Sequence, residues 1–346
     1  MRLLIVTQAV DTEDPVLGFF VRWIEELAKR FERVEVICLK EGKHKLPGNV
    51  AVHSLGKEKY AAENTPISGS VFRRAAYTFR FLSLVWRLRC GYDAVFVHMN
   101  QEYILIAGWL WKLLGKRIYM WRNHYAGSWL TDVAASFCTK VFCTSKHSYT
   151  AKYRKTELMP VGVDTERFTP EHGARKHHSI LFLARMAPSK RPEILLDALA
   201  MLARDGVHFT ASFVGSPLPQ DASYYEGFKA RAETLGFGDS VSFHPAVPNA
   251  KTPELYRAHQ VFVNTSPSGM LDKTLFEAAA CGCRVLSTSA DFAELAGPAA
   301  HFDTATELAE KLRAAPAARA GSESPAFIAQ QSLTVLASKL FNALSV

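Results

Sequence analysis

The sequence predicts an α/β protein of two doubly wound, Rossmann-like domains, each built on a parallel sheet with helices on both faces. The chain has 346 residues, which is enough for two hydrophobic cores of ordinary size. Short runs rich in Val, Ile, Leu and Phe alternate with amphipathic stretches of helical length, as in parallel sheets that helices cover. The alternation stops once near the middle and then starts again, so we expect two such domains in tandem.

The expected strands of both halves are short and almost entirely apolar. They cover residues 3–8, 34–39, 94–98, 117–121 and 141–143, and then 179–184, 210–214, 241–243, 261–264 and 284–287. Between the two sets, the segment LMPVGVDTERFTPEHGAR at 158–175 holds two prolines and two glycines, as linkers do. We expect domains at 1–165 and 170–324, and a helix at 325–346 that packs back on the first domain. Ligands of such sheets bind beyond the carboxyl ends of the strands, which places the expected site in the interdomain cleft.

The composition is typical of a soluble globular protein, with 48% hydrophobic and 21% charged residues. The sequence shows no apolar run of about 18 residues and no export signal, so we expect no membrane-spanning helix. The six cysteines are scattered and several lie in apolar runs, which favours buried thiols in a reducing, cytoplasmic compartment. Cys281 and Cys283 lack a second Cys/His pair at metal-ligand spacing, and we expect no metal site.

The positive charge is concentrated in the first half of the chain. Residues 1–170 hold 25 Lys and Arg against 16 Asp and Glu, whereas the remainder holds 16 against 17. Such an excess points to an acidic partner, either nucleic acid or an anionic membrane surface. Nucleic acid is disfavoured because the sequence contains no recognised binding module.

A basic, aromatic segment at 71–90 predicts an amphipathic helix. A second segment, ILIAGWLWKLLGKR, adds Trp109 and Trp111. Such helices suit a protein that lies on an anionic bilayer, where each cation near the surface adds about 1 kcal/mol. The alternative is that the apolar residues form the core of the domain and the arginines are merely solvated. The candidate membrane-surface residues are Arg73, Arg74, Arg80, Trp86, Arg87 and Arg89.

Two cations follow the first strand of the second half. The strand at 179–184 leads into Arg185, Lys190 comes five residues later, and a helical stretch follows. Both side chains are then expected at a strand's carboxyl end beside a helix N-terminus, where a diphosphate binds well. Each charge-assisted hydrogen bond contributes roughly 1.5 to 3 kcal/mol. Two solvated surface cations are the alternative.

The segment NTSPSGMLDKTLFEAAACGCRVLST at 264–288 predicts a strand end, a small-residue loop, a helix and another strand. Glu277 lies among apolar residues of the helix. A carboxylate in such surroundings is costly unless it accepts hydrogen bonds, and a ribose offers two adjacent hydroxyl donors. A salt-bridged glutamate that holds the helix to its neighbour is the alternative.

Arg185, Lys190, the segment at 264–288 and PVGVDTERF at 160–168 together resemble the family 4 glycosyltransferases of GT-B fold. The resemblance implies retaining transfer of a sugar from a nucleotide-diphosphate sugar. It also implies that Arg185 and Lys190 bind the donor diphosphate and that Glu277 binds the ribose. It implies no metal and no other cofactor, because the two cations supply the positive charge. The loops after two further strands resemble the surroundings of the base and contribute Gly215, Pro245 and Val247.

The sequence departs from the family pattern at 269–273. The family usually has two glutamates eight positions apart, and here the first position is Gly269. The form SGMLDK resembles a recurring variant of the family, which we interpret as divergence in donor preference. Asp272 either contacts a sugar hydroxyl or caps the following helix. Lys273 is either a further donor contact or a solvated first-turn lysine.

Three residues of the first half are candidates at the same sheet edge. Gly18 resembles the family's glycine-bearing acceptor loop, although a helix-start turn explains a single glycine as well. His98, on the acceptor side, ends the expected strand at 94–98, and His124 follows the expected strand at 117–121. His124 matches the family histidine that contacts the donor sugar and is counted with the catalytic residues. Without the resemblance, both histidines are equally well explained as structural, hydrogen-bonded residues.

The sequence therefore predicts a retaining glycosyltransferase with a UDP- or GDP-sugar donor and a glycan or lipid-linked acceptor. It would act in the biosynthesis of a cell-surface polysaccharide or glycolipid, in the cytoplasm or on the inner face of the plasma membrane. Cations on the leaving diphosphate act in the transition state, because negative charge accumulates there as the glycosidic bond lengthens. Two alternatives stay open: a non-catalytic nucleotide-sugar-binding subunit, which Gly269 suggests, and a nucleotide-sugar epimerase on the same fold.

Overall fold

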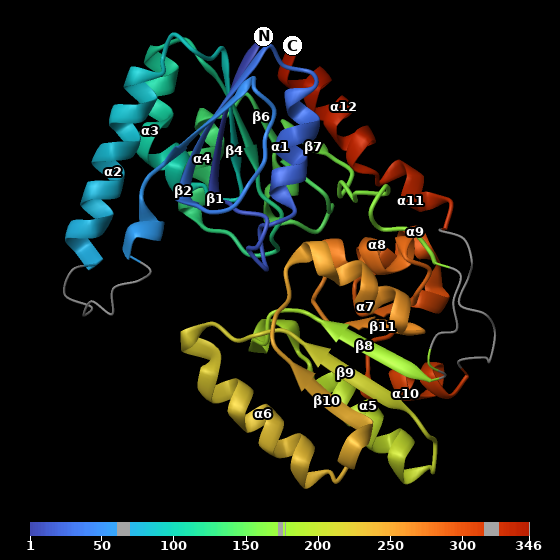
Figure 1. The fold of residues 1–346 in the computed structure, drawn as a ribbon. Helices are drawn as coiled ribbons and strands as arrows, with labels where there is room; N and C mark the ends of the chain where they lie inside the picture. Colours follow the sequence, from blue (N-terminus) through green and yellow to red (C-terminus); the bar gives the residue numbers. More distant parts are fainter. Residues whose placement is uncertain (61–69, 172–175, 177, 315–324, 346) are drawn as a thin grey trace. The chain divides into compact units, whose positions relative to one another are not determined.

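The computed structural model describes residues 1–60, 70–171, 176, 178–314 and 325–345, and the chain forms two compact units (Figure 1). Unit 1 comprises Met1–Pro160, Pro248–Ala250 and Leu333–Val346, and unit 2 comprises Val161–Val247 and Lys251–Ser332. The division after residue 160 falls inside the expected linker, of which residues 172–175 lie outside the described part. Residues 325–332 belong to unit 2, and the chain returns to unit 1 at Leu333.

In the described part of unit 1, a seven-stranded parallel sheet has the order β3-β2-β1-β4-β5-β6-β7. The order reverses between β1 and β4, as in doubly wound sheets. The strands are β1 (Arg2–Val10), β2 (Arg33–Glu41), β3 (Val50–Ser54), β4 (Ala94–His98), β5 (Arg117–Trp121), β6 (Lys140–Cys143) and β7 (Thr156–Leu158). The helices are α1 (Phe20–Ala28), α2 (Ser70–Arg87), α3 (Glu102–Leu113), α4 (Trp129–Phe137) and α12 (Leu333–Ser345).

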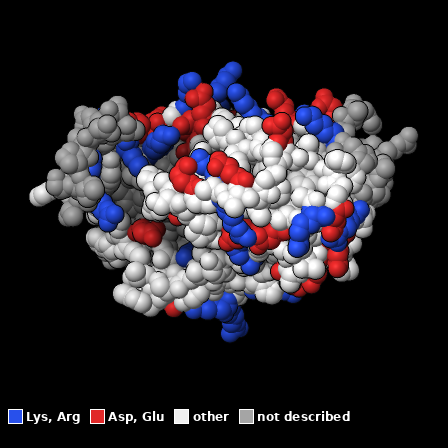
Figure 2. Space-filling view, turned by 90° about the horizontal axis from the view of Figure 1, so that it is seen from below, with Lys and Arg blue, Asp and Glu red and all other residues white. Residues whose placement is uncertain are grey.

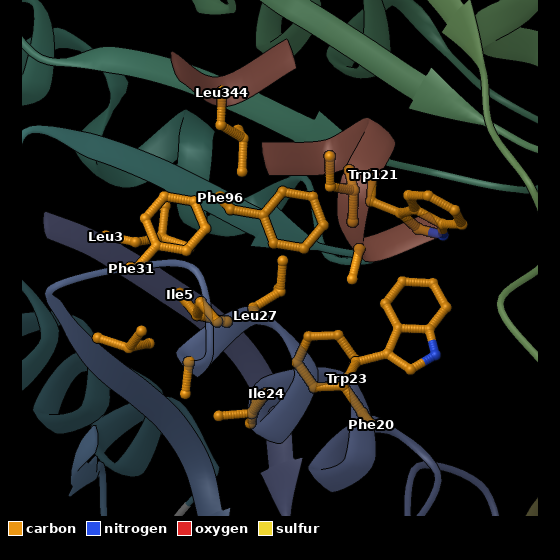
Figure 3. Packing of buried hydrophobic residues seen from close by; sticks show 14 of the residues in the cluster. Leu3, Ile5, Phe20, Trp23, Ile24, Leu27, Phe31, Phe96, Trp121 and Leu344 are labelled. Atoms are coloured by element: carbon orange, nitrogen blue, oxygen red, sulfur yellow. The ribbon is translucent and has the colours of Figure 1, made fainter. Parts of the chain in front are cut away.

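Each face of the unit 1 sheet has its own hydrophobic core. Helices α1 and α12 cover one face, where Trp23, Phe96 and Leu344 pack together (Figure 3). Helices α2, α3 and α4 cover the other face, on which Phe81 and Trp111 are buried. Because both faces are covered, the central strands are apolar on both sides, which is why they are readable in the sequence as continuous apolar runs.

Unit 2 is a smaller doubly wound domain. Within the described residues its five parallel strands have the order β10-β9-β8-β11-β12. The strands are β8 (Ser179–Leu183), β9 (Thr210–Val214), β10 (Val241–His244), β11 (Val261–Asn264) and β12 (Arg284–Ser287). The helices are α5 (Glu193–Arg204), α6 (Ala222–Thr234), α7 (Thr252–Ala258), α8 (Lys273–Ala280), α9 (Ala290–Ala296), α10 (Ala305–Arg313) and α11 (Phe327–Gln330).

The predicted fold class is confirmed, with three differences in detail. Strands β3 and β7 were not predicted, because the half-buried sequence VAVHS and the short sequence TEL lack a continuous apolar run. The expected helix at 325–346 is instead two helices, α11 and α12, with a break at Gln331 and Ser332. Trp111 is buried rather than exposed, and its indole donates to the hydroxyl of Tyr92 at 3.1 Å. Among the residues described, no helix has the length and apolar character needed to cross a bilayer.

Candidate functional site

The carboxyl edge of the unit 2 sheet brings most of the predicted donor-binding residues together. Arg185 and Lys190 follow β8, Gly215 follows β9, Pro245 follows β10, and the loop from Thr265 to Asp272 follows β11. The parallel register aligns these strand ends, since Leu183 of β8 pairs with Val214 of β9. The carboxyl edge is the position at which ligands bind in open parallel sheets.

The two predicted phosphate-binding cations differ in their surroundings. Arg185 is exposed, and its guanidinium makes no hydrogen bond or ion pair with the described residues. Lys190, in contrast, is half-buried, and its Nζ lies 2.6 Å from Oδ2 of Asp272 and 3.0 Å from Oγ of Ser266. Lys190 is therefore held at a fixed position, whereas the Arg185 side chain can still adapt to a ligand.

Asp272 is the centre of a polar network that ties the loops after β8 and β11 together. Its Oδ2 accepts hydrogen bonds from Lys190, from the Ser266 hydroxyl at 2.5 Å and from Nδ2 of Asn264 at 3.0 Å. The pKa of Asp272 is lowered from its ordinary value, because these contacts outweigh a desolvation that acts in the opposite direction. Asp272 precedes α8, but its side chain makes no capping hydrogen bond, so the capping alternative is wrong.

Gly269 occupies a backbone conformation that explains the departure from the paired-glutamate pattern. Its φ is +91°, which side chains other than glycine rarely adopt. The residue is buried, and its N–H donates to Oδ2 of Asp291 at 3.0 Å. Leu271 also has a positive φ, of 36°. A glutamate at 269 would strain the loop as it is folded here. The backbone conformation of this loop therefore favours glycine at position 269.

Glu277 is buried and is bonded to a neighbouring helix. It lies on α8 with 1% exposure, and its Oε2 accepts a hydrogen bond from the Tyr256 hydroxyl of α7 at 3.2 Å. Burial and the neighbouring Glu277 carboxylate raise the pKa of Tyr256 well above its ordinary value, so Tyr256 remains a donor. The contact links α8 to α7, which is close to the helix-holding alternative.

Lys273 lies at the start of α8 and is not simply a solvated lysine. Its Nζ donates to the carbonyl oxygen of Gly162 at 2.6 Å. Desolvation lowers the pKa of Lys273 to about 7, although the carboxylates of Glu277 and Asp164 act in the opposite direction. The lysine thus joins α8 to the segment that precedes β8.

The loops after β9 and β10 are bonded to each other. The N–H of Gly215 donates to the carbonyl of His244 at 2.9 Å, and the N–H of Ala246 donates to the Ser216 hydroxyl at 3.0 Å. A Cβ at Gly215 would lie 1.9 Å from the carbonyl oxygen of Ala184, so only glycine allows the two backbones to approach this closely. Pro245 is exposed, whereas Val247 packs partly against the core.

His124 lies in the loop after β5, at the carboxyl edge of the unit 1 sheet. Its ring stacks on Tyr125 with centroids 4.6 Å apart, and its Nδ1 accepts a hydrogen bond from the N–H of Ala126 at 2.9 Å. Arg122 steadies the same loop, because its Nη1 donates to the Ala126 carbonyl at 2.9 Å. His124 is half-buried, and these contacts within the loop fix its position.

His98 and Gly18 have structural explanations. His98 is 1% exposed and stacks on Phe20 of α1, with ring centroids 3.8 Å apart. Its side chain is therefore part of the core beneath the sheet edge, which corrects its assignment to the acceptor side. Gly18 forms the turn before α1: its N–H donates to the Asp14 carbonyl at 3.0 Å, and a Cβ would lie 2.6 Å from that oxygen.

The predicted basic helix exists as α2, and most of its arginines are on the surface. Arg74, Arg80, Trp86 and Arg87 are exposed and Arg73 is half-buried. Beyond the helix end, the Arg89 guanidinium lies over the Trp86 ring, 4.4 Å from its centroid. In the view of Figure 2, basic and acidic side chains are interspersed, so the net charge forms no single patch on the face shown there.

Three residues at the unit 2 edge were not predicted. Arg191, with a φ of 48°, donates from Nε to the Thr265 carbonyl at 2.7 Å and from Nη2 to the Thr288 hydroxyl at 2.9 Å. It thereby joins the loops after β8, β11 and β12. Ser266 and Asp291 complete the network around Lys190 and Gly269. Only the cation pair Lys190–Arg191 before a proline was visible in the sequence as a signal.

Residues 177–315, which include this edge, match the family model described as glycosyl transferases group 1. This part of the chain is therefore similar to that family. A D-inositol 3-phosphate glycosyltransferase of Segniliparus rotundus is 34% identical over 150 residues, which are 40% of this chain and 33% of the relative. The chain thus spans about a third of the length of this curated relative.

Solved structures resemble the chain over nearly its whole length. The structure of Anabaena Alr3699/HepE in complex with UDP and glucose has a TM-score of 0.76 at 20% identity, covering 100% of this chain and 99% of that one. A glycosyltransferase from Rickettsia africae has a TM-score of 0.72 at 13% identity, covering 99% and 98%. These similarities confirm the predicted GT-B fold class.

Proposed function

We propose that the chain is a retaining glycosyltransferase that uses a nucleotide-diphosphate sugar and acts on a glycan or lipid-linked acceptor. The observation that carries the proposal is the carboxyl edge of the unit 2 sheet, where exposed Arg185 and the fixed ammonium of Lys190 follow the same strand within a group 1 domain. The similar structure solved with UDP and glucose supports a UDP-sugar as the donor to test first.

In this proposal, Arg185 and Lys190 bind the two phosphates of the donor. The charge on the leaving diphosphate grows as the bond to the sugar lengthens, so these cations stabilise the transition state more than the ground state. Lys190 is already held by Asp272 and Ser266, which reduces the reorganisation needed when the donor binds. His124 contacts the donor sugar. The acceptor hydroxyl attacks from the face that the diphosphate leaves, and a phosphate oxygen accepts its proton.

In this proposal Glu277 accepts hydrogen bonds from the ribose hydroxyls. The contact from the Tyr256 hydroxyl to Oε2 does not by itself exclude this role, because a carboxylate has about four lone-pair positions on its two oxygens.

The activity test is transfer of radiolabelled sugar from UDP- and GDP-sugars to a membrane lipid extract. We expect label in the lipid fraction with one donor. Replacement of Arg185 and Lys190 together by Ala should lower kcat/KM by about a hundredfold to ten-thousandfold, because two charge-assisted hydrogen bonds are lost. Arg204→Ala, at the exposed end of α5, is the matched control and should retain the wild-type rate.

Three outcomes separate this proposal from its alternatives. Unchanged turnover in the double variant would reject the site. Conversion of the free donor without transfer would identify an epimerase, and donor binding without either reaction would identify a non-catalytic subunit.

A further inference from the structure

An aromatic residue followed by an arginine recurs every seven positions along α2. Seven residues are close to two full turns, so the repeats lie along one line of the helix. The aromatic members are strongly exposed, at 81%, 77% and 52%, whereas Phe81, Leu84 and Val85 of the same helix are buried in the core. The repeating pairs are Phe72–Arg73, Phe79–Arg80 and Trp86–Arg87.

The neighbouring helices on the same face of the sheet also carry exposed apolar side chains. Trp109 and Leu113 of α3 and Trp129 of α4 are all at least half exposed. Helices α2, α3 and α4 share one hydrophobic core, and therefore cover the same face of the unit 1 sheet (Figure 1). On the opposite face, α1 and α12 present no exposed large hydrophobic side chain among the described residues. The difference between the two faces marks the first as an interaction surface.

The chemistry of the stripe favours a lipid partner of negative charge. The sequence of α2 contains arginines but no Asp or Glu, so nothing on the helix itself offsets their charge. Exposed aromatic rings beside arginines are typical of helices that lie in the interface of an anionic bilayer. The indole of Trp109 already donates to the carbonyl of Ile106 at 2.8 Å, so moving this ring into an apolar medium leaves no donor unsatisfied.

We infer that the α2–α4 face of unit 1, led by the aromatic–arginine stripe of α2, docks on an anionic phospholipid surface. The aromatic rings enter the headgroup region and the arginines contact lipid phosphates. The inference deepens the proposed function and depends on it for one point, the location of the acceptor, which it places in the bilayer.

Vesicle sedimentation tests the inference with the full chain. We expect the protein to bind vesicles of equal parts phosphatidylcholine and phosphatidylglycerol and to dissociate from them as the salt concentration is raised. It should not bind vesicles of phosphatidylcholine alone. Arg80→Glu with Arg87→Glu should weaken binding by at least about tenfold. Phe79→Ser with Trp86→Ser should weaken it to a similar degree with the charge unchanged.

The charge-matched control is Arg204→Glu with Lys339→Glu, two exposed positions outside this face. It makes the same change in net charge and should bind vesicles as the wild type does, whereas an equal loss in control and test variants would overturn the inference. Absence of wild-type binding to anionic vesicles would overturn it too. So would a dimer seen by light scattering that Phe79→Ser with Trp86→Ser dissociates, since the occupant would then be a second copy.

Binding of UDP-glucose by calorimetry, on the same preparations, separates this inference from the proposed function. Variants that no longer bind vesicles but still bind the nucleotide sugar would support the docking face. If the wild-type protein binds vesicles but no UDP- or GDP-sugar, the proposed donor site is wrong and the docking inference is still supported.

Discussion

The side chains at the carboxyl edge of the unit 2 sheet bond to other protein groups, whereas many on the α2–α4 face of unit 1 are exposed to solvent. At the unit 2 edge, polar groups such as Lys190, Asp272 and Arg191 are bonded to one another and to the loop backbones. On the α2–α4 face, large side chains such as Phe79 and Trp129 meet solvent. In the proposals made above, the first region is arranged in advance for a charged ligand, whereas the second would gain apolar contacts only from another surface.

The largest expected effect tests whether the unit 2 edge depends on close backbone packing. Gly215→Ala places a Cβ 1.9 Å from the Ala184 carbonyl oxygen at a φ of +153°. We expect the free energy of unfolding to fall by roughly 2 to 4 kcal/mol, measured by urea denaturation. Gly227→Ala in α6 is the control, because nothing lies within 4 Å of its Cβ and alanine favours a helix. Equal stability of the two variants would contradict the close approach.

The next effect concerns the charge pair at the centre of the network. Asp272→Asn leaves the Lys190 ammonium without its carboxylate, and we expect a loss of about 1 to 3 kcal/mol at pH 7, since both side chains keep some exposure. Because the pKa of Asp272 is lowered in the folded state, this stabilisation is complete above the unfolded-state pKa of about 4 and disappears as pH falls through the folded-state pKa. The difference between wild type and variant should therefore shrink in acid. Exposed Asp239→Asn should show no difference at either pH.

A smaller effect tests the explanation for the missing glutamate. Gly269→Glu would restore the usual family residue, but the φ of +91° should make it cost about 1 to 2 kcal/mol and lower turnover. Asn tolerates positive φ better, so Gly269→Asn should lose less. A stable Gly269→Glu protein with higher turnover would show that the loop can take the family's common form.

The smallest expected effect is a pH dependence of the free energy of unfolding rather than a loss of stability. The pKa of Lys273 is about 7 in the folded state and about 10.4 when unfolded, so the unfolded state binds more protons between these values. The free energy of unfolding should therefore rise with pH above 7, by less than about 1 kcal/mol per pH unit because the lysine keeps some exposure. Urea denaturation at neutral and alkaline pH should show this rise in wild type and in the control Lys251→Met, but not in Lys273→Met.

Much of the fold could be predicted from the sequence, because central parallel strands are apolar on both sides. Residues 94–98, 210–214, 261–264 and 284–287 were predicted with the bounds that the structure gives. The two edge strands of unit 1, β3 and β7, were missed, since a strand such as β7 buries too little to need an apolar run. The break at Gln331 depends on tertiary contacts: its backbone carbonyl accepts from the N–H of Gly162 and Val163, which no local pattern signals.

The candidate site could be predicted at the level of which loops carry it, but not of what its side chains do. Arg185 and Lys190 are placed by strand position alone. The Lys190–Asp272 contact joins residues that are 82 positions apart in the sequence, so only the fold reveals it. His98 could not be assigned to the core from its place at a strand end, because its burial depends on Phe20 from another element.

Helix α12 has a consequence for the order in which the protein can assemble during synthesis. Its side chains Leu336, Leu340 and Leu344 complete a core of unit 1, yet they are translated after every residue of unit 2. Unit 2 can therefore fold before α12 has been synthesised, whereas unit 1 cannot complete its core until then. Until α12 is made, Phe31 and its apolar neighbours lack the side chains that cover them. A nascent chain stalled before residue 333 would therefore expose apolar surface that chaperones bind.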